Sequence, residues 1–164
     1  MYEYCTALKP DLRPNGVLVL TLDNPPTNAF KGAMHDNLRR VLEDVNHDPD
    51  ARVVVITGAG ERAFSAGGDI REMQRMLDEP MATLQSFVEA RRLLQAFLRA
   101  EKPVIARING HAVGLGATIA LFSDLAYAVE GAKIADPHVA MGYAAGDGGA
   151  LIWPQLIGYM RARE

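Results

Sequence analysis

Residues 52–70 read RVVVITGAGERAFSAGGDI, and this stretch decides the fold. Its first six residues form a nearly continuous apolar run, which is typical of a β-strand buried on both faces of a parallel sheet. A glycine-bearing loop follows from Gly58 to Asp69, and a helical pattern begins at Ile70. A buried strand that leads through a tight loop into a helix indicates an α/β domain.

The segments on either side of this stretch repeat the order of strand and helix. Upstream, Gly16–Leu22 predicts a strand that pairs with a weaker one at Met1–Leu8, and Lys31–His47 has the apolar spacing of a helix with one buried stripe. Downstream we expect helices at about 70–77 and 81–100, a strand at 103–108, a helix at 114–123, a strand at 125–129 and a helical stretch at 151–160. In the helix at 81–100 the residues expected to face inward are Leu84, Phe87, Val88, Leu94 and Leu98.

Composition excludes several classes of function. The 164 residues are 49% apolar and 23% charged, with a net charge of −3. The basic residues are scattered, whereas nucleic-acid binding needs a clustered basic surface, so we expect no nucleic-acid partner. We expect no membrane segment, because no apolar run approaches the roughly 20 residues that span a bilayer. The N-terminus lacks the apolar core of a signal peptide and Cys5 is the single cysteine, so we expect a cytoplasmic protein.

Two glycine-rich loops stand out as candidate functional segments. They are Ala63–Ile70 (AFSAGGDI) and Asn109–Gly116 (NGHAVGLG), and each leads from a predicted strand into a predicted helix. Ligands of α/β sheets bind at this end of the strands, and small residues let a ligand approach backbone N–H groups. Two such N–H groups facing each other would form an oxyanion hole. The alternative is that both loops are only tight turns.

Taken in order along the chain, these segments resemble the enoyl-CoA hydratase/isomerase (crotonase) family. The likeness rests on Asn28-Ala29, the loop 63–70, residues 102–106 (KPVIA), Asn109-Gly110 with Gly114 and Gly116, and the glycines at 142, 148 and 149. The resemblance implies an α/β spiral of ββα units, and 1–164 as a core domain that lacks the C-terminal helices. It also implies a homo-oligomer, either a trimer or a hexamer. The implied substrate is an acyl-CoA thioester, with coenzyme A as part of the substrate and no other cofactor.

The resemblance also assigns residues to the site. The oxyanion hole would be the backbone N–H groups of Ala66 and Leu115, where Leu115 replaces the usual glycine. Contacts with the substrate and coenzyme A are implied for Ala66, Gly67, Gly68, Asp69, Ile70, Leu115 and Thr118.

The two glutamates that activate water in hydratases of this family are absent. Thr118 and His138 stand at the matching positions. A threonine hydroxyl is no general base near neutral pH, which argues against hydration by that route. His138 has a suitable pKa, and Asp147 lies nine residues further on. A carboxylate on one ring nitrogen would fix the tautomer and leave the other nitrogen free for the substrate or a water.

The stretch from Asp136 to Pro154 is similar to the 6-oxocamphor hydrolase branch, which has a His–Asp pair at this spacing and cleaves a carbon–carbon bond of a diketone without coenzyme A. Three hypotheses therefore stay open: an acyl-CoA enzyme that uses His138 and Asp147, a β-diketone hydrolase acting on a small carbonyl compound, and a non-catalytic subunit of the same fold.

Structural roles compete with these assignments. Asp147 could be only a helix N-cap, and His138 an ordinary half-buried histidine. We interpret His111 and Ser65 as structural, and His35 and His47 as solvated residues of the first helix. No group of His, Cys and Asp has the sequence spacing of a metal site, so no metal is expected.

Overall fold

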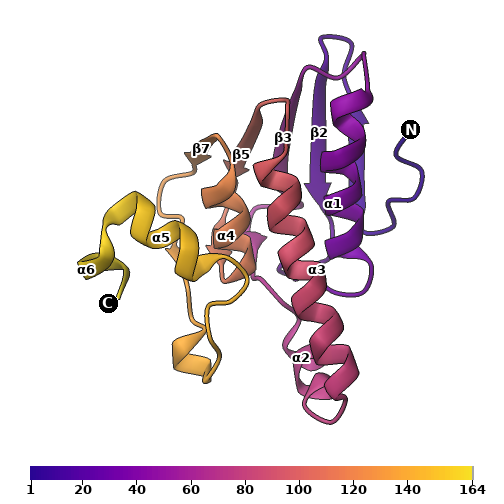
Figure 1. The fold of residues 1–164 in the computed structure, drawn as a ribbon. Helices are drawn as coiled ribbons and strands as arrows, with labels where there is room; N and C mark the ends of the chain where they lie inside the picture. Colours follow the sequence, from indigo (N-terminus) through magenta and orange to yellow (C-terminus); the bar gives the residue numbers. More distant parts are fainter. Residues whose placement is uncertain (164) are drawn as a thin grey trace.

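A five-stranded sheet forms the centre of the computed structural model, which describes residues 1–163 (Figure 1). The strand order is β1-β2-β3-β5-β7. The antiparallel edge strand β1 pairs with β2, and the other neighbours are parallel. The strands are β1 (Leu8–Leu12), β2 (Val17–Leu22), β3 (Val53–Gly58), β5 (Val104–Ile108) and β7 (Leu125–Ala128). A smaller parallel sheet has the order β4-β6-β8 and contains Ala63–Ser65, His111–Val113 and Ile134–Ala135.

Helices cover one face of the large sheet. In Figure 1, α1, α3 and α4 lie side by side in front of the strands, and α2 with the first turns of α3 extends beyond the carboxyl ends of the parallel strands. The helices are α1 (Met34–Asp44, continued by the 3-10 turn Val45–His47), α2 (Ile70–Met76), α3 (Pro80–Leu98), α4 (Leu115–Phe122), the 3-10 turn η2 (Val139–Met141), α5 (Gly149–Ile157) and α6 (Tyr159–Ala162). Within residues 1–163, none of them is long and apolar enough to cross a bilayer.

The chain repeats one unit three times along the sheet. β3 joins the large sheet, β4 joins the small one, and α2 and α3 follow. The runs β5-β6-α4 and β7-β8-α5 do the same. This arrangement confirms the expected spiral of ββα units. Because β4 and β6 are parallel neighbours, the turns that lead from them into α2 and α4 lie at the same end of the small sheet.

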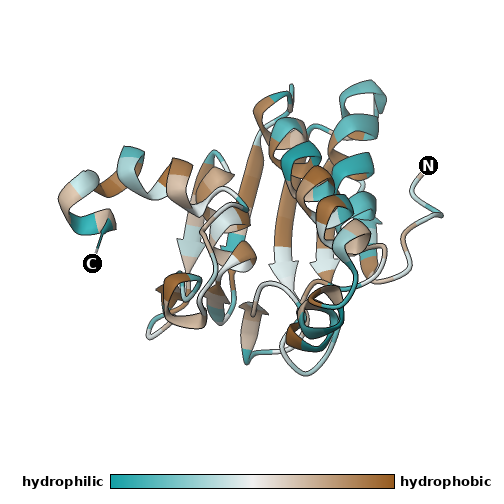
Figure 2. Cartoon of the chain, turned by 60° about the horizontal axis from the view of Figure 1, so that its bottom comes forward, coloured by the Kyte–Doolittle hydropathy of each residue, from teal (hydrophilic) through white to brown (hydrophobic). Residues whose placement is uncertain are grey.

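The core lies between the sheet and the three covering helices. Alternate residues of β2 and β3 point toward the helices and are buried, among them Leu18, Leu20 and Ile56. Figure 2 shows the apolar strands beneath helices whose outer sides are polar. Helix α1 contributes Leu38 and Leu42 from its single apolar stripe, as its spacing predicted.

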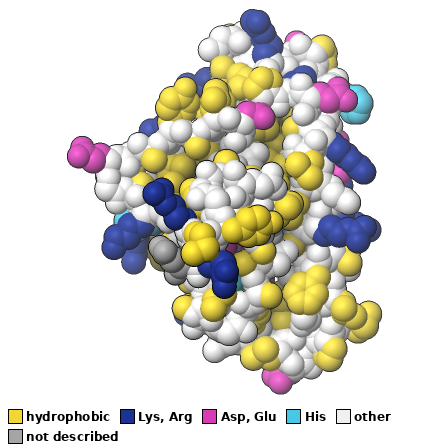
Figure 3. Space-filling model, turned by 60° about the vertical axis from the view of Figure 1, so that its left-hand side comes forward, with side chains coloured by type: hydrophobic (Ala, Val, Ile, Leu, Met, Phe, Trp, Pro, Cys, Tyr) yellow, Lys and Arg dark blue, Asp and Glu magenta, His cyan; other side chains and the backbone are white. Residues whose placement is uncertain are grey.

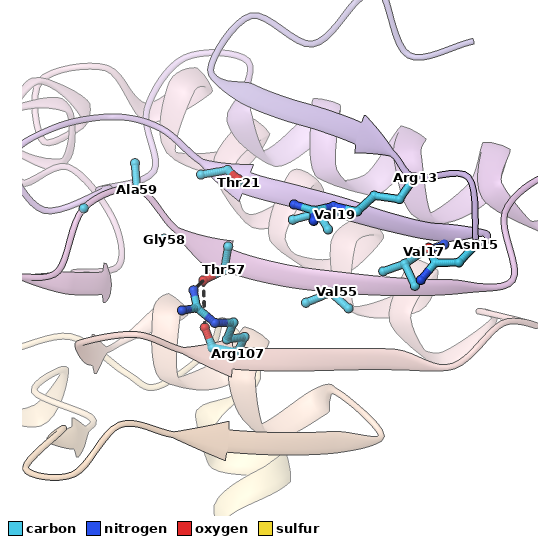
Figure 4. A pocket seen from close by; sticks show the side chains of 11 residues that line it. Arg13, Asn15, Val17, Val19, Thr21, Val55, Thr57, Gly58, Ala59 and Arg107 are labelled. Carbon is cyan, nitrogen blue, oxygen red and sulfur yellow. Dashed lines mark hydrogen bonds between the residues drawn. The ribbon is translucent and has the colours of Figure 1, made fainter.

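The opposite face of the large sheet departs from the prediction. Val53 and Val55 of β3 are only half-buried there, because within residues 1–163 no helix covers this side. The face is hollowed into an open groove of about 680 Å³ lined by valines and threonines of β2 and β3, with Arg13 and Arg107 among its walls (Figure 4). The groove lies on the face away from α1, α3 and α4. The expectation that β3 is buried on both faces is therefore wrong.

Two further expectations need correction. The first strand is Leu8–Leu12 rather than Met1–Leu8, and Leu8 pairs with Leu22. The segment before it is held on the outside of α1, where the Tyr4 hydroxyl donates to Asp44 at 2.7 Å. In α3 the buried residues are Leu93, Ala96 and Phe97. Four of the five residues expected to face inward are exposed instead, namely Leu84, Phe87, Val88 and Leu98. The first half of α3 extends past the sheet, so its apolar residues meet no core there (Figure 1), whereas Leu98 is exposed as the last residue of the helix.

The glycine at position 116 is required by the packing of α4 on the first glycine loop. A Cβ at Gly116 would lie 2.8 Å from Cβ of Ser65 and would also overlap the backbone of Ser65. By contrast, a Cβ at Gly146 would meet only one atom, at 3.9 Å. Close packing of helix on loop therefore depends on the first glycine and not on the second.

We expect Gly116→Ala to lower the free energy of unfolding by about 2–3 kcal/mol, because backbone must move to admit the methyl group. Gly146→Ala is the matched control and should change it by less than about 1 kcal/mol. Urea unfolding followed by circular dichroism measures both. Equal stability of the two variants would show that α4 does not pack as described.

Candidate active site

The two glycine-rich loops meet where β4 leads into α2 and β6 leads into α4. Gly67 and Gly114 both have positive φ, +83° and +54°, a conformation that favours glycine. A Cβ at Gly67 would lie 2.7 Å from the carbonyl oxygen of Val113 and 3.1 Å from the backbone nitrogen of Leu115. The absence of a side chain at Gly67 is thus what lets the first loop lie against the N-terminus of α4.

Hydrogen bonds identify the N–H groups of the first loop that are already used. The Ala66 N–H donates to the carbonyl of Thr27 at 2.9 Å. The Gly67 N–H donates to the Ser65 hydroxyl at 3.2 Å, and the Asp69 N–H to the Phe30 carbonyl at 2.9 Å. Ala66 is therefore not available as an oxyanion-hole donor, and that assignment is wrong. Its partner, Thr27, is distant in the sequence, which is why the motif did not reveal the bond.

Gly68 is the remaining donor of the loop. Within residues 1–163 its N–H meets no protein acceptor, because the bridge from Phe30 uses only the groups of Gly67 and Asp69 on either side. Gly68 is half-buried. The first loop thus offers one unpaired N–H, two residues after the position expected.

The second loop offers the N–H of Leu115. This residue is the first of α4, where helical N–H groups have no partner within the helix. Gly114 before it donates to Ala135 at 2.9 Å, and Thr118 donates back to Gly114 at 3.0 Å. Within the described chain no protein atom accepts from the Leu115 N–H. The Leu115 side chain is buried in the core, so the departure from glycine leaves the backbone donor in place.

His138 lies directly beside this helix N-terminus. Its Cε1 atom is 3.6 Å from the position that a Cβ on Gly114 would occupy. Its Nε2 atom is 3.3 Å from Oδ2 of Asp147, so the predicted pair does form. The other ring nitrogen, Nδ1, is bonded to Oδ1 of Asp136. The sequence reasoning missed Asp136, although the spacing Asp-x-His allows the turn in which the His138 N–H donates to the same carboxylate at 3.1 Å.

The charged triad, defined as Asp136, His138 and Asp147, keeps the imidazole protonated. The hydrogen bond to Asp147 and then that to Asp136 raise the pKa of His138 to about 9, against the opposing effect of burial. Nδ1 is hydrogen-bonded to Asp136 and Nε2 forms an ion pair with Asp147, so neither nitrogen is free. The expectation that one nitrogen serves as a base toward the substrate is therefore wrong, and the available proton acceptors are the carboxylates.

Asp147 is the carboxylate held most fully in place. Its Oδ1 accepts from the Thr118 hydroxyl at 3.3 Å and from the Gly149 N–H at 3.4 Å. The cap of α5 itself is Gly148, so capping accounts for only part of the role of Asp147. Thr118 is completely buried, which contradicts the contact with substrate assigned to it. It supports Asp147 instead.

The other predicted contacts divide between structure and surface. Asp69 caps α2, because its carboxylate accepts from the N–H groups of Arg71 at 2.9 Å and Glu72 at 3.2 Å. Ile70 is 57% exposed and is free to meet a ligand. His111 is exposed, and its Nδ1 accepts from the Lys133 N–H, which agrees with a structural role.

The charged triad is also the only group of three His, Cys, Asp or Glu residues in the described chain that is compact enough for a metal ion, with donor atoms within 4.8 Å of one another. Its geometry does not fit one. The two carboxylates contact different nitrogens of the same ring, and a metal ion binds a single ring nitrogen. The arrangement suits an imidazolium between two carboxylates.

His35 contradicts the expectation of a solvated residue. It is half-buried in the first turn of α1, and its ring lies 5.2 Å from that of Phe30. Burial lowers the pKa of His35 below its ordinary value. The two histidines of the site region are thus shifted in opposite directions.

We expect an NMR titration of the imidazole protons to separate these two residues. His138 should titrate near pH 9 and His35 below about 6.5. Because the pKa of His138 is raised in the folded state, its contribution to stability is complete below pH 6.5 and is lost as the pH rises through 9. A His138 signal that titrates at or below pH 6.5 would contradict the charged triad.

Comparison with known proteins agrees with this architecture. Residues 13–164 match the family described as enoyl-CoA hydratase/isomerase. The chain is 34% identical over 164 residues to the mitochondrial enoyl-CoA hydratase of Pongo abelii, covering 99% of this chain and 54% of that protein. It is 35% identical over 150 residues to 1,2-epoxyphenylacetyl-CoA isomerase of Escherichia coli, covering 90% and 57%. The chain therefore spans a little over half the length of these relatives.

Solved structures give the same answer. An enoyl-CoA hydratase/isomerase from Mycobacterium paratuberculosis superposes with a TM-score of 0.91 at 36% identity, covering 97% of this chain and 64% of that one. An enoyl-CoA hydratase from Bacillus anthracis superposes with a TM-score of 0.89 at 30% identity, covering 96% and 61%. With its ββα spiral and its paired glycine loops, the chain belongs to the enoyl-CoA hydratase/isomerase (crotonase) family.

Proposed function

We propose that the protein binds an acyl-CoA thioester and stabilises the enolate that forms when a proton leaves the acyl chain. The observation that supports this most strongly is the contact of Gly67 with the N-terminus of α4, which brings together the unpaired N–H groups of Gly68 and Leu115. The names of the relatives compared above also point to CoA thioesters as substrates.

The hole acts on the charge that develops on the thioester oxygen. A proton removed next to the carbonyl leaves its electron pair in an enolate, whose oxygen accepts from both N–H groups. Such preorganised donors stabilise a developing oxyanion by several kcal/mol, and the dipole of α4 adds to the effect. Because both donors are backbone N–H groups, the proposed hole does not depend on the side chain of Leu115, and Gly68 has none.

Asp147 is the acid and base in this proposal, and His138 is its charged partner. The Asp147 carboxylate takes the proton from one carbon and returns it to the same or another carbon, so nothing enters or leaves the acyl group. The imidazolium of His138 and the Thr118 hydroxyl orient the carboxylate. Asp136 holds the other side of the imidazole and keeps its proton in place.

A proton shuttle of this kind favours isomerisation over the two-glutamate hydration. Position 118 is a buried threonine and position 138 a protonated histidine, so neither supplies a carboxylate to activate water. The relatives include both hydratases and an isomerase, so their names leave the choice open.

The two other hypotheses have less support. Cleavage of a β-diketone by a His–Asp pair needs a ring nitrogen that accepts a proton from water, and both nitrogens of His138 already contact carboxylates. A non-catalytic subunit would have no reason to keep three ionisable groups 15–16% exposed beside a helix N-terminus, because their desolvation costs stability.

We also propose that the protein forms a homo-oligomer. Figure 3 shows the face that carries α5 and α6, where apolar side chains gather. Tyr127, Leu156, Tyr159 and Met160 are each at least 55% exposed. Contiguous apolar surface of this kind is typical of a protein interface.

The role of Asp147 can be tested by hydrogen exchange at the carbon next to the thioester. In D₂O the intact protein should incorporate deuterium into butyryl-CoA, and Asp147→Asn should slow this by at least about 100-fold, the usual loss when a general base is removed. Calorimetric binding of the same compound should change by less than about threefold. NMR measures the exchange, and Asp78→Asn, an exposed aspartate, is the control. Unchanged exchange in Asp147→Asn would overturn the assignment.

The Leu115 donor can be removed with a proline, because the first position of a helix tolerates proline; the substitution deletes that N–H together with the leucine side chain. Leu115→Ala is the matched control, since it loses the buried side chain and keeps the donor. We expect Leu115→Pro to slow the exchange at least about 50-fold more than Leu115→Ala does. Circular dichroism checks that both variants fold. Equal exchange rates in two folded variants would exclude this N–H from the hole.

A further inference from the structure

The buried face of α3 continues toward the N-terminus of the helix with a glutamate, Glu89. Leu93, Ala96 and Phe97 pack on the sheet, and Glu89 lies one helical turn before Leu93 on the same face. The first turns of α3 extend beyond the carboxyl ends of the parallel strands (Figure 1), and the Glu89 carboxylate is among the charges that act on the His35 imidazole. Glu89 is half-buried, and its Oε1 accepts from the Gln85 amide at 2.9 Å. Glutamate is seldom buried without a charged partner, so its presence on the buried face of α3 is unexpected if the helix has only a structural role.

His35 approaches the same region from α1, which packs against α3. Its ring lies against Phe30, whose carbonyl accepts from Asp69 at 2.9 Å and whose N–H donates to Gly67 at 2.7 Å. Phe30 is therefore hydrogen-bonded to the residues on both sides of Gly68. Within residues 1–163 the ring nitrogens of His35 have no hydrogen-bond partner in the protein, so they are free for another molecule.

Negative charge predominates around His35. The carboxylates that act on its imidazole are Glu89 of α3, Glu72 of α2 and Asp147 before α5. Glu72 is held by the Gly32 N–H and lies 3.9 Å from Arg75, while Glu89 has no ion pair within the described chain. Because burial lowers its pKa, His35 is neutral at pH 7 and offsets none of this charge.

Resting on the function proposed above, we propose that His35 and Glu89 form a subsite for the acyl chain that selects a hydrogen-bond donor, such as a hydroxyl group, over a plain alkyl chain or a carboxylate. A carboxylate side chain only accepts hydrogen bonds, and a neutral imidazole has one donor and one acceptor. A hydroxyl group can therefore donate to Glu89 and accept from His35 at once. A carboxylate on the substrate would meet like charge instead.

The test compares three acyl-CoA compounds of the same chain length with the intact protein by calorimetry: butyryl-CoA, 4-hydroxybutyryl-CoA and succinyl-CoA. We expect the hydroxyl compound to bind about tenfold more tightly than butyryl-CoA, and succinyl-CoA at least about tenfold more weakly. Glu89→Gln should reduce the penalty on succinyl-CoA, and His35→Leu should remove the preference for the hydroxyl group. Binding of butyryl-CoA should stay within about threefold in both variants.

Glu101→Gln is the control, because Glu101 is exposed after the far end of α3 and its loss makes the same change in net charge. If the protein binds none of the three compounds, the acyl-CoA function itself is wrong. If it binds all three but discriminates equally well in Glu89→Gln, His35→Leu and Glu101→Gln, the acyl-CoA function stands and the subsite is overturned.

Discussion

The close approach of Gly67 to the N-terminus of α4 is the constraint on which the site depends. It requires a positive φ at both Gly67 and Gly114, and it leaves no room for a Cβ at the first of them. The approach is possible because β4 and β6 are neighbours in the small sheet, so that their turns into helices leave the sheet side by side. The same contact fixes the donors, since the loop bends so that Ala66, Gly67 and Asp69 find protein acceptors and Gly68 does not. Backbone groups alone thus supply the two unpaired N–H groups that the proposed oxyanion hole requires.

In the proposed function, the charged triad adds to this backbone site the group that moves a proton. Burying an imidazolium and two carboxylates at about 15% exposure is costly, and the cost is offset only when all three are bonded to one another. The polar contacts of Asp147 meet this condition, because the Thr118 hydroxyl and the Gly149 N–H donate to Oδ1 and His138 Nε2 lies 3.3 Å from Oδ2. Removing the histidine would leave two buried carboxylates facing each other. His138 is therefore better understood as the residue that makes a buried, oriented carboxylate possible than as a base.

Local patterns in the sequence were sufficient to predict most helices and strands and part of the candidate site. The apolar run of β3, the glycines of both loops and the spacing of His138 and Asp147 each express a local requirement. The strand forms, the two loops meet and His138 lies beside Asp147, although β3 is not buried on both faces. The predictions failed where a partner comes from elsewhere in the chain. The acceptor for Ala66 is contributed by the segment before α1, and the side of α3 that is buried depends on where the sheet ends beneath it. Asp136 lies only two residues before His138, so a contact between them could have been predicted. The sequence pattern alone does not show that the imidazole contacts a second carboxylate.

Charge balance connects the triad with the region around His35. One imidazolium faces Asp136 and Asp147, while Glu72 and Glu89 lie on the side of α2 and α3 and the neutral His35 compensates neither. The excess of negative charge would repel a free carboxylate and would also raise the cost of forming an enolate nearby. The proposed hole would therefore have to supply more stabilisation than one in a neutral site, and the Leu115 N–H lies at the N-terminus of α4, where the helix dipole is positive. In the proposed function, the acidic region around His35 and the positive end of α4 are complementary, because a thioester with a neutral or donating acyl chain would satisfy both.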